Sequence, residues 1–76
     1  MITVRLYGLL RLDSGIKEQS MAADSVRDVL HQLSGLGLNP KTLSGCVILV
    51  NGTTAKKRTK LNPGEVVQLL PPVAGG

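Results

Sequence analysis

The chain has 76 residues, enough for one domain; 42% of them are hydrophobic, and a single tyrosine is the only aromatic residue. This composition, with 18% charged residues and a formal net charge of +4, excludes an intrinsically disordered chain and predicts a core of branched aliphatic side chains. One cysteine excludes both an internal disulfide and a thiolate metal cage.

The first element that the sequence predicts is a strand over residues 2–7, where apolar and polar side chains alternate. Gly8 breaks this pattern, and residues 9–14 are expected to form a helical turn or a loop. A weaker strand is predicted over residues 16–22. Together these segments predict a β-hairpin over residues 2–22.

The same N-terminal stretch, MITVRLYG, bears on the location of the protein. It carries no basic leader followed by an apolar run, so we expect no signal peptide. No apolar run approaches the roughly 20 residues that span a bilayer. We therefore expect a cytoplasmic protein without a membrane partner.

A helix is predicted over residues 25–35. Apolar residues at helical spacing fall on one face, namely Val26, Val29, Leu30 and Leu33. Ser25 can cap the first free N–H groups, and Asp28 places negative charge where the helix dipole favours it. Gly35 and Gly37 are expected to end the helix.

The next predicted strand covers residues 46–50, CVILV, a continuous apolar run typical of a strand buried on both faces. Residues 39–40, Asn-Pro, open a loop or a short turn before it. Residues 51–52, Asn-Gly, favour a type I′ turn. Residues 53–60 are expected to form a short exposed strand.

The last predicted strand covers residues 66–70, after a turn at residues 62–64, Asn-Pro-Gly. Pro71 and Pro72 lack N–H donors and end this strand. The resulting order is β-β-α-β-β-β, or ββαββ with a short extra strand. An α+β fold, with a mixed sheet and one helix packed across it, buries both apolar faces most simply.

Side chains that carry chemistry are sparse and isolated. His31 has no partner at metal or triad spacing and is expected to be solvated or half-packed. Cys46 opens the apolar strand, where a free cysteine behaves as a small hydrophobe. The acids show no paired spacing: Asp13, Glu18, Asp24, Asp28 and Glu65. We therefore expect no catalytic side chain and no metal site.

Four of the nine basic residues lie within five positions, at Lys56, Lys57, Arg58 and Lys60. A charged edge strand that resists aggregation is the favoured explanation. Contact with an acidic partner surface is the next. Nucleic-acid binding is disfavoured, because the aromatic side chains on which single-stranded bases stack are missing.

The C-terminal segment is chemically unusual. It consists of Pro71, Pro72, Val73, Ala74, Gly75 and Gly76. The two prolines favour a stiff, extended exit from the sheet, and the valine offers an apolar anchor. The last three residues are slim enough to thread a carboxylate through a narrow channel of a partner. An ordinary disordered terminus explains the same residues.

These features resemble the MoaD/ThiS family of sulfur-carrier proteins, which are ubiquitin-like β-grasp domains. The resemblance covers the whole chain. It lies in the ββαββ order, VNG at residues 50–52, LNPGEVVQLLPPV at residues 61–73 and the terminal Gly75-Gly76. Within the family the chain is most similar to the small subunit of molybdopterin synthase, whose tail typically reads PPV, a small residue and two glycines.

The resemblance implies a function for the C-terminus. An E1-like adenylyltransferase would adenylate the Gly76 carboxylate with ATP and magnesium. A sulfur donor, such as a cysteine desulfurase or a rhodanese-type protein, would then displace AMP and leave a thiocarboxylate. The molybdopterin synthase large subunit, or another acceptor enzyme, would receive the sulfur. The carrier would be a protein substrate rather than an enzyme and would bind no cofactor.

The resemblance also implies a division of the chain and an interface. Residues 1–70 would form the β-grasp domain, and residues 71–76 a flexible tail. The exposed sheet face near the last strand, around Val66 and Leu70, is expected to dock the activating enzyme. The sequence does not say which of Leu69 and Leu70 points outward.

The chain departs from the family at residues 62–65, where Asn-Pro-Gly-Glu replaces the common Asp-Gly-Asp-Glu, and in being basic rather than acidic. These departures leave the carrier class in place and several pathways open. Carriers for thiamine synthesis, cysteine synthesis or tRNA thiolation end in similar tails. So do ubiquitin-like modifiers that form isopeptide bonds with lysines. A noncovalent β-grasp interaction module is a further alternative.

Overall fold

The computed structural model describes residues 1–71, which form five strands and three helices. They are β1 (Ile2–Leu6), α1 (Gly8–Ser14), β2 (Glu18–Met21), α2 (Val26–Gly35), α3 (Pro40–Ser44), β3 (Val47–Val50), β4 (Thr53–Thr54) and β5 (Val66–Leu70). This order contains the predicted β-β-α-β-β-β series with two short helices added. None of the helices within residues 1–71 has the length and apolar character that crossing a bilayer requires.

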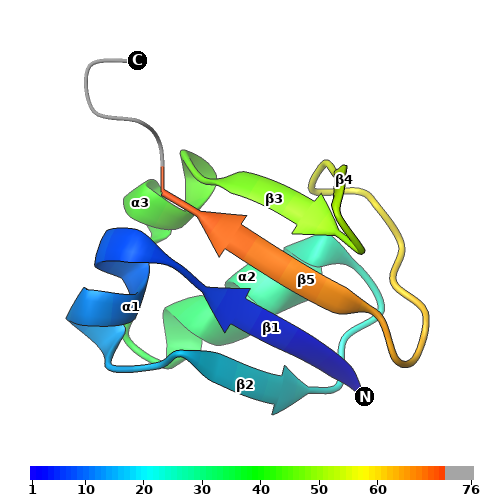
Figure 1. The fold of residues 1–76 in the computed structure, drawn as a ribbon, viewed down its shortest axis with the longest axis horizontal. Helices are drawn as coiled ribbons and strands as arrows, with labels where there is room; N and C mark the ends of the chain where they lie inside the picture. Colours follow the sequence, from blue (N-terminus) through cyan, green and yellow to red (C-terminus); the bar gives the residue numbers. More distant parts are fainter. Residues whose placement is uncertain (72–76) are drawn as a thin grey trace.

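The strands of this part of the chain form one mixed sheet in the order β2-β1-β5-β3-β4 (Figure 1). The central strands β1 and β5 run parallel, with Val4 opposite Val67. β2 pairs antiparallel with β1, and β3 pairs antiparallel with both β5 and β4. The predicted pairing of the first two strands is therefore confirmed, and α1 lies where a helical turn or a loop is expected.

Helix α2 lies where the apolar periodicity predicts it. The Ser25 hydroxyl accepts a hydrogen bond from the Asp28 amide at 3.3 Å, and the Asp28 carboxylate accepts one from the Asp24 amide at 3.0 Å. These two bonds satisfy free N–H groups at the start of the helix. Gly35 is the last helical residue, and Gly37 takes a φ of 104° just beyond it. The predicted cap and the predicted glycine stop are both confirmed.

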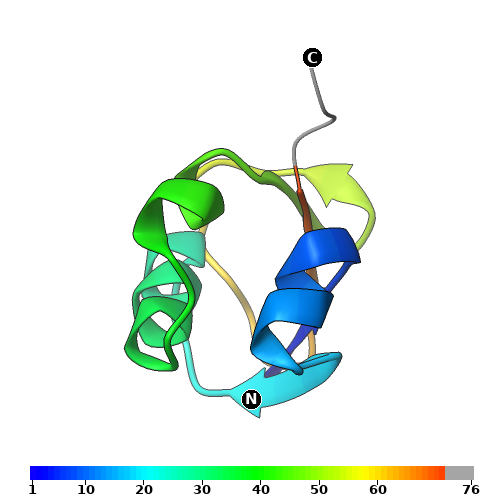
Figure 2. The same cartoon turned by 90° about the vertical axis from the view of Figure 1, so that its left-hand side faces the viewer.

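The hydrophobic core lies between the sheet and the helices. Figure 2 shows α2 and α3 on one face of the sheet, whereas no helix of the described residues covers the other face. Aliphatic side chains from both layers, each at most 7% exposed, fill the space between them: Ile2, Val4, Leu6, Leu10, Met21, Val26, Val29, Leu33, Leu38, Leu43, Ile48, Leu61, Val67 and Leu69. The predicted aliphatic core is confirmed.

Two turns align β5 with its neighbours. Asn51 and the glycine after it have φ values of 50° and 84°, as the predicted type I′ turn requires. In the second turn the Glu65 amide donates to the Asn62 carbonyl at 3.2 Å, and Gly64 has a φ of 86°. The Asn51 side chain links the two turns, because it accepts from the Val66 amide at 2.9 Å and donates to the Glu65 carboxylate at 3.2 Å.

Three sequence predictions need correction. Residues 46–50 are not buried on both faces, because no described helix covers the outer face of β3 and Val47 is 48% exposed there. The strand expected over residues 53–60 is limited to Thr53–Thr54, after which the chain turns away toward α2. Residues 39–40 start helix α3, where the Asn39 side chain accepts from the Lys41 amide at 2.9 Å.

Candidate functional site

The uncovered face of the sheet carries an apolar patch on β3 and β5. We call Val47, Leu49, Val66 and Leu70 the open patch. Val47 lies opposite Leu70 in the strand register, and Leu49 lies diagonal to both Val66 and Leu70. Val47 is exposed and the other three side chains are half-buried. The open patch therefore offers contiguous apolar area to a partner.

The last two residues of β5 point to opposite faces, as the alternation along a strand requires. Leu69 is fully buried in the core, and Leu70 is half-buried on the open face. The structure thus brings the two predicted interface residues, Val66 and Leu70, onto the same face of one strand. Gln68 separates them.

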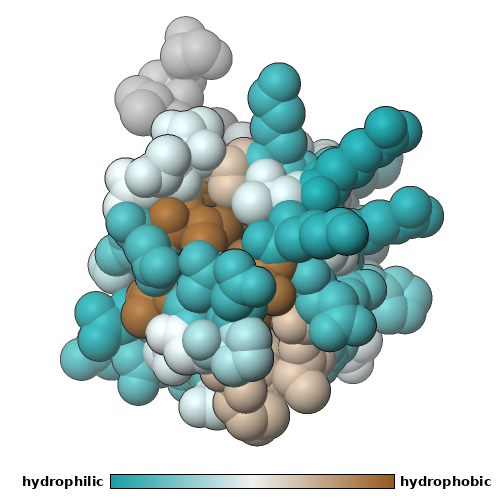
Figure 3. Space-filling model, turned by 90° about the vertical axis from the view of Figure 1, so that its right-hand side faces the viewer, coloured by the Kyte–Doolittle hydropathy of each residue, from teal (hydrophilic) through white to brown (hydrophobic). Residues whose placement is uncertain are grey.

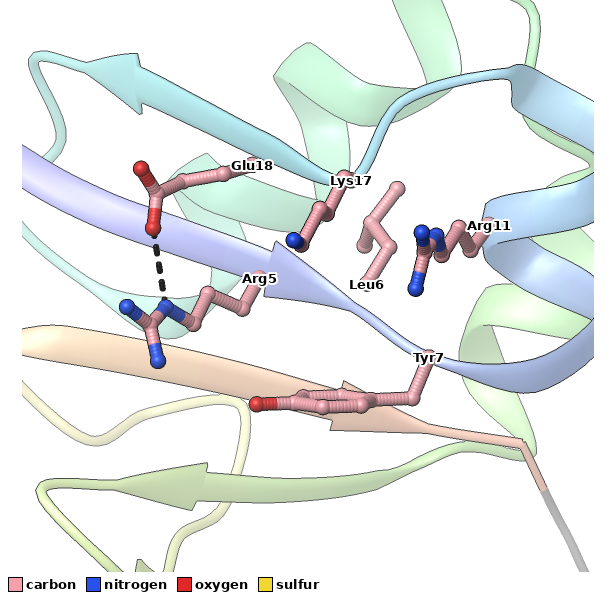
Figure 4. Close-up of a pocket in the computed structure, with 6 residues that line it drawn as sticks. All are labelled: Arg5, Leu6, Tyr7, Arg11, Lys17 and Glu18. Carbon is pink, nitrogen blue, oxygen red and sulfur yellow. Dashed lines mark hydrogen bonds and ion pairs between the residues drawn. The ribbon is translucent and has the colours of Figure 1, made fainter.

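A polar cleft of about 450 Å³ adjoins this face across β1 (Figure 4). Its walls are Arg5, Leu6, Tyr7, Arg11, Lys17 and Glu18. Arg5 Nε donates to Glu18 Oε1 at 2.8 Å, and this carboxylate raises the pKa of Arg5 further. Gln68 Nε2 donates to the Tyr7 hydroxyl at 2.9 Å, which ties the cleft to β5. With three cations and one acid, the cleft gives the open patch a positively charged border.

Sequence reasoning missed this cleft. The sequence could have indicated the contribution of Arg5 and Tyr7, because they occupy the polar positions of the alternating strand at residues 2–7 and therefore face away from the core. The contributions of Arg11 and Lys17 depend on how α1 and β2 return to β1, and no sequence motif encodes that arrangement.

A close contact between Gly8 and Pro71 sets the point where the C-terminal segment leaves the sheet. Gly8 has a φ of 56°, and a Cβ on it would lie 2.8 Å from Pro71 Cγ. Just before it, the Tyr7 amide donates to the Leu69 carbonyl at 3.2 Å. The missing side chain of Gly8 therefore makes room for the Pro71 ring. The sequence pattern marks Gly8 only as the end of a strand.

Most of the predicted reactive segment lies outside the described residues. These residues are Pro72, Val73, Ala74, Gly75 and Gly76. The reactive carboxylate of Gly76 and the threading of the tail into a partner therefore stay predictions. The described residue of the segment, Pro71, is half-buried beside α1.

The other candidate side chains lie apart from the open patch. His31 is exposed on α2, as the solvated alternative predicts. Cys46 is half-buried before β3, where its Sγ donates to the Thr42 carbonyl at 3.1 Å and burial raises the pKa of its thiol. A raised pKa lowers the thiolate fraction at neutral pH, in keeping with a packing role. Within residues 1–71, no three His, Cys, Asp or Glu side chains gather as metal ligands would.

Comparison with protein families identifies the family of the chain. The model of the ThiS family matches residues 4–76, nearly the whole sequence. The chain belongs to the ThiS family. The predicted relationship to MoaD/ThiS-type, ubiquitin-like sulfur carriers is thereby confirmed, and membership supports a carrier or modifier role.

Solved structures confirm the β-grasp fold of this ThiS-family protein. Small archaeal modifier protein 1 of Methanosarcina acetivorans is 26% identical, with a TM-score of 0.81 over 99% of this chain and 95% of that one. A chain from the complex of subunits 1 and 2 of the Helicobacter pylori molybdopterin-converting factor is 28% identical, with a TM-score of 0.67 over 99% and 97%. SAMP1 of Haloferax volcanii is 24% identical, with a TM-score of 0.79 over 99% and 98%. No curated protein sequence matches the chain.

Proposed function

We propose that this ThiS-family protein is a sulfur carrier whose working group is the main-chain carboxylate of Gly76. An E1-like enzyme joins the carboxylate to the α-phosphate of ATP, bound with magnesium, and pyrophosphate leaves. The outer sulfur of a persulfide on the sulfur donor then attacks the acyl carbon of this mixed anhydride, and AMP leaves. Thiols reduce the acyl disulfide that forms, which returns the donor's thiol and leaves a thiocarboxylate that a further enzyme consumes.

The observation that carries this proposal is the family match, which extends through Gly76. The geometry supports it, because the C-terminal segment starts at Pro71, directly after Leu70 of the open patch. A partner that covers the open patch is therefore positioned to receive the segment. The proposal needs no catalytic side chain from the carrier, since the reacting group belongs to the main chain.

We assign the first contact with the activating enzyme to the open patch and its charged border. Val47 and Leu70 supply apolar area at the end of β5 where the segment leaves. Arg5, Arg11 and Lys17 favour a partner surface that places carboxylates around an apolar centre. The sulfur acceptor would use the same face in its turn, because it too must reach the C-terminus.

We place the carrier in the synthesis of molybdopterin, where the thiocarboxylate supplies the dithiolene sulfur. Two observations support this choice. The tail reads PPVAGG, as the small subunits of molybdopterin synthase typically do, and a chain of the Helicobacter pylori molybdopterin-converting factor is 28% identical. A second candidate is a ubiquitin-like modifier that joins Gly76 to lysines of target proteins. The likeness to the Methanosarcina acetivorans modifier favours this alternative.

Deletion of Gly75 and Gly76 tests the proposal. We expect the shortened chain to lose sulfur transfer completely in a reaction with its E1-like enzyme, ATP and a sulfur source. Its thermal unfolding should match that of the full chain, because the core residues all lie before Pro71. A shortened chain that still accepts sulfur would contradict the role of the C-terminus.

A further inference from the structure

A second surface rich in charge lies at the end of the molecule that carries the loop between β4 and β5. We call Arg27, Lys57, Arg58 and Lys60 the basic surface; all four side chains are exposed. They line a shallow cleft of about 510 Å³ with Asp24 as its one acid. Figure 3 views the molecule from this end and shows long hydrophilic side chains projecting around patches of hydrophobic surface.

The backbone holds the basic surface in a fixed arrangement. The Thr59 carbonyl accepts from the Val26 amide, and the Lys57 carbonyl accepts from the Arg27 amide, both at 3.0 Å. The Leu61 amide donates to the Asp24 carbonyl at 2.8 Å. The loop is therefore bonded to the start of α2. The loop backbone needs little further ordering to meet a ligand, which lowers the entropic cost of binding.

The charges of the basic surface are not neutralised by neighbouring acids. Among residues 1–71 the only ion pair joins Arg5 to Glu18, on the opposite side of the sheet. Asp24 lines the cleft and Asp28 lies close in sequence, but within residues 1–71 neither carboxylate forms an ion pair with these cations. Four exposed cations held on one surface create a positive potential that attracts carboxylates.

Protection of a sheet edge does not account for this arrangement. The edge strand β4 consists of Thr53 and Thr54, neither of them charged. The cations follow in the loop, which is bonded to α2 and not to the free edge of β4. The explanation favoured by the sequence, a charged edge strand, therefore does not describe where these side chains lie.

Apolar side chains lie between the cations. Leu61, 7% exposed, lines the cleft of the basic surface. A second cleft of about 280 Å³ continues along α2 and α3 and includes Leu30 and Leu43. Arg27 and Lys57 line both clefts. Leu61 and Leu43 belong to the core, so the half-buried Leu30 supplies most of the apolar area beside Arg27 and Lys57. A surface that only repels other chains needs no such apolar area.

We infer that the basic surface binds a carboxylate-rich segment of a partner protein that carries an apolar residue between its acids. The apolar residue would lie over Leu30, and the acids would pair with the cations around it. Single-stranded nucleic acid is disfavoured because Tyr7, the only aromatic residue of the sequence, follows β1 on the open face of the sheet and is not available for base stacking here. The phosphates of a duplex would pair with the cations but would leave the apolar side chain of Leu30 without a partner. A protein segment is therefore favoured over nucleic acid.

This docking site is separate from the one in the proposed function. The open patch lies on the uncovered face of the sheet, whereas the basic surface joins α2 to the loop on the helical side (Figures 1 and 2). One partner could therefore hold the carrier while another works on its C-terminus. The inference does not depend on sulfur chemistry.

Binding of defined probes to the full-length, ¹⁵N-labelled protein tests the inference. The probes are a short peptide of glutamates around one leucine, the same peptide with serine in place of leucine, and single-stranded and duplex DNA. We expect the leucine peptide to shift the amide signals of residues 25–31 and 56–61 and to bind more tightly than the serine peptide. The affinity for the leucine peptide should fall as the salt concentration rises.

Charge variants provide the control. Lys57→Gln with Arg58→Gln should weaken binding of the leucine peptide by about fivefold or more, because two exposed ion pairs are lost. Lys41→Glu on α3 makes the same change in net charge at a residue that lines neither cleft, and it should leave binding of the peptide within about twofold. The inference is wrong if these two variants bind the peptide equally, if the serine peptide binds as tightly as the leucine peptide, or if either DNA binds this surface more tightly than the leucine peptide. No activating enzyme or ATP is present, so failure here is distinct from failure of sulfur transfer.

Discussion

Gly8 has a backbone conformation that favours glycine, and it also contacts the residue at which the C-terminal segment leaves the sheet. Its positive φ disfavours any side chain, and a Cβ would collide with Pro71. We expect Gly8→Ala to lower the free energy of unfolding by about 2 kcal/mol, of which the left-handed conformation accounts for about 1–2 kcal/mol. Urea denaturation measures this change.

Two other glycines separate the causes of that loss. Gly15 has a φ of 73° with open space around its Cα, so Gly15→Ala should show the conformational cost alone. Gly35 is helical with nothing near it, and Gly35→Ala should stabilise by roughly 0.5 kcal/mol. A Gly8→Ala variant no less stable than Gly15→Ala would refute the contact with Pro71.

At the residue scale, the sequence did not predict features that depend on contacts between distant parts of the chain. The strand break at Gly8 was readable, but its contact with Pro71 joins opposite ends of the chain. Leu69 and Leu70 are both apolar, so the pattern could not say which one faces outward. The register of β5 against β1 and β3 decides this question.

At the scale of elements, the open patch on β3 and β5 is the surface to test. We expect Leu70→Glu to weaken binding of the E1-like enzyme by about tenfold or more, because it places a charge among apolar side chains at the interface. Leu12→Glu is the matched control: Leu12 is 75% exposed on α1 and is not one of the open-patch residues. Titration calorimetry measures both affinities, and thermal unfolding confirms that each variant folds.

The comparison of these two variants decides whether the open patch contacts the E1-like enzyme. Equal affinities for Leu70→Glu and Leu12→Glu, both close to that of the unaltered chain, would remove the open patch from the interface. A loss limited to Leu70→Glu supports the proposed contact.

Elements with a strong local signal were predicted accurately. α2 has an apolar face, a serine cap and a glycine stop, and β5 lies between a turn and a proline, so their boundaries follow from local chemistry. The prediction that β3 is buried on both faces was wrong, because a continuous apolar run does not reveal whether a second layer covers the strand. For residues 9–14 the sequence allows a helical turn or a loop, because the helix that forms there, α1, carries no side-chain cap and buries only Leu10.

At the scale of the whole molecule, the fold presents two surfaces of different character. The uncovered sheet face combines the open patch with the start of the C-terminal segment, whereas the helical side and the loop before β5 carry the basic surface. The family resemblance predicted the β-grasp fold and the position of the first surface. The second could be read from the sequence only as a charge run, because bonds to α2 decide where Lys57 and Arg58 lie.

The central claim is that Gly76 carries sulfur. The most direct measurement is the intact mass of the full-length protein after incubation with its E1-like enzyme, ATP and a sulfur source. We expect the mass gain of a single oxygen-to-sulfur exchange, located at Gly76 by fragmentation and absent without ATP. An unchanged mass, or Gly76 joined to a lysine as the only product, would contradict it.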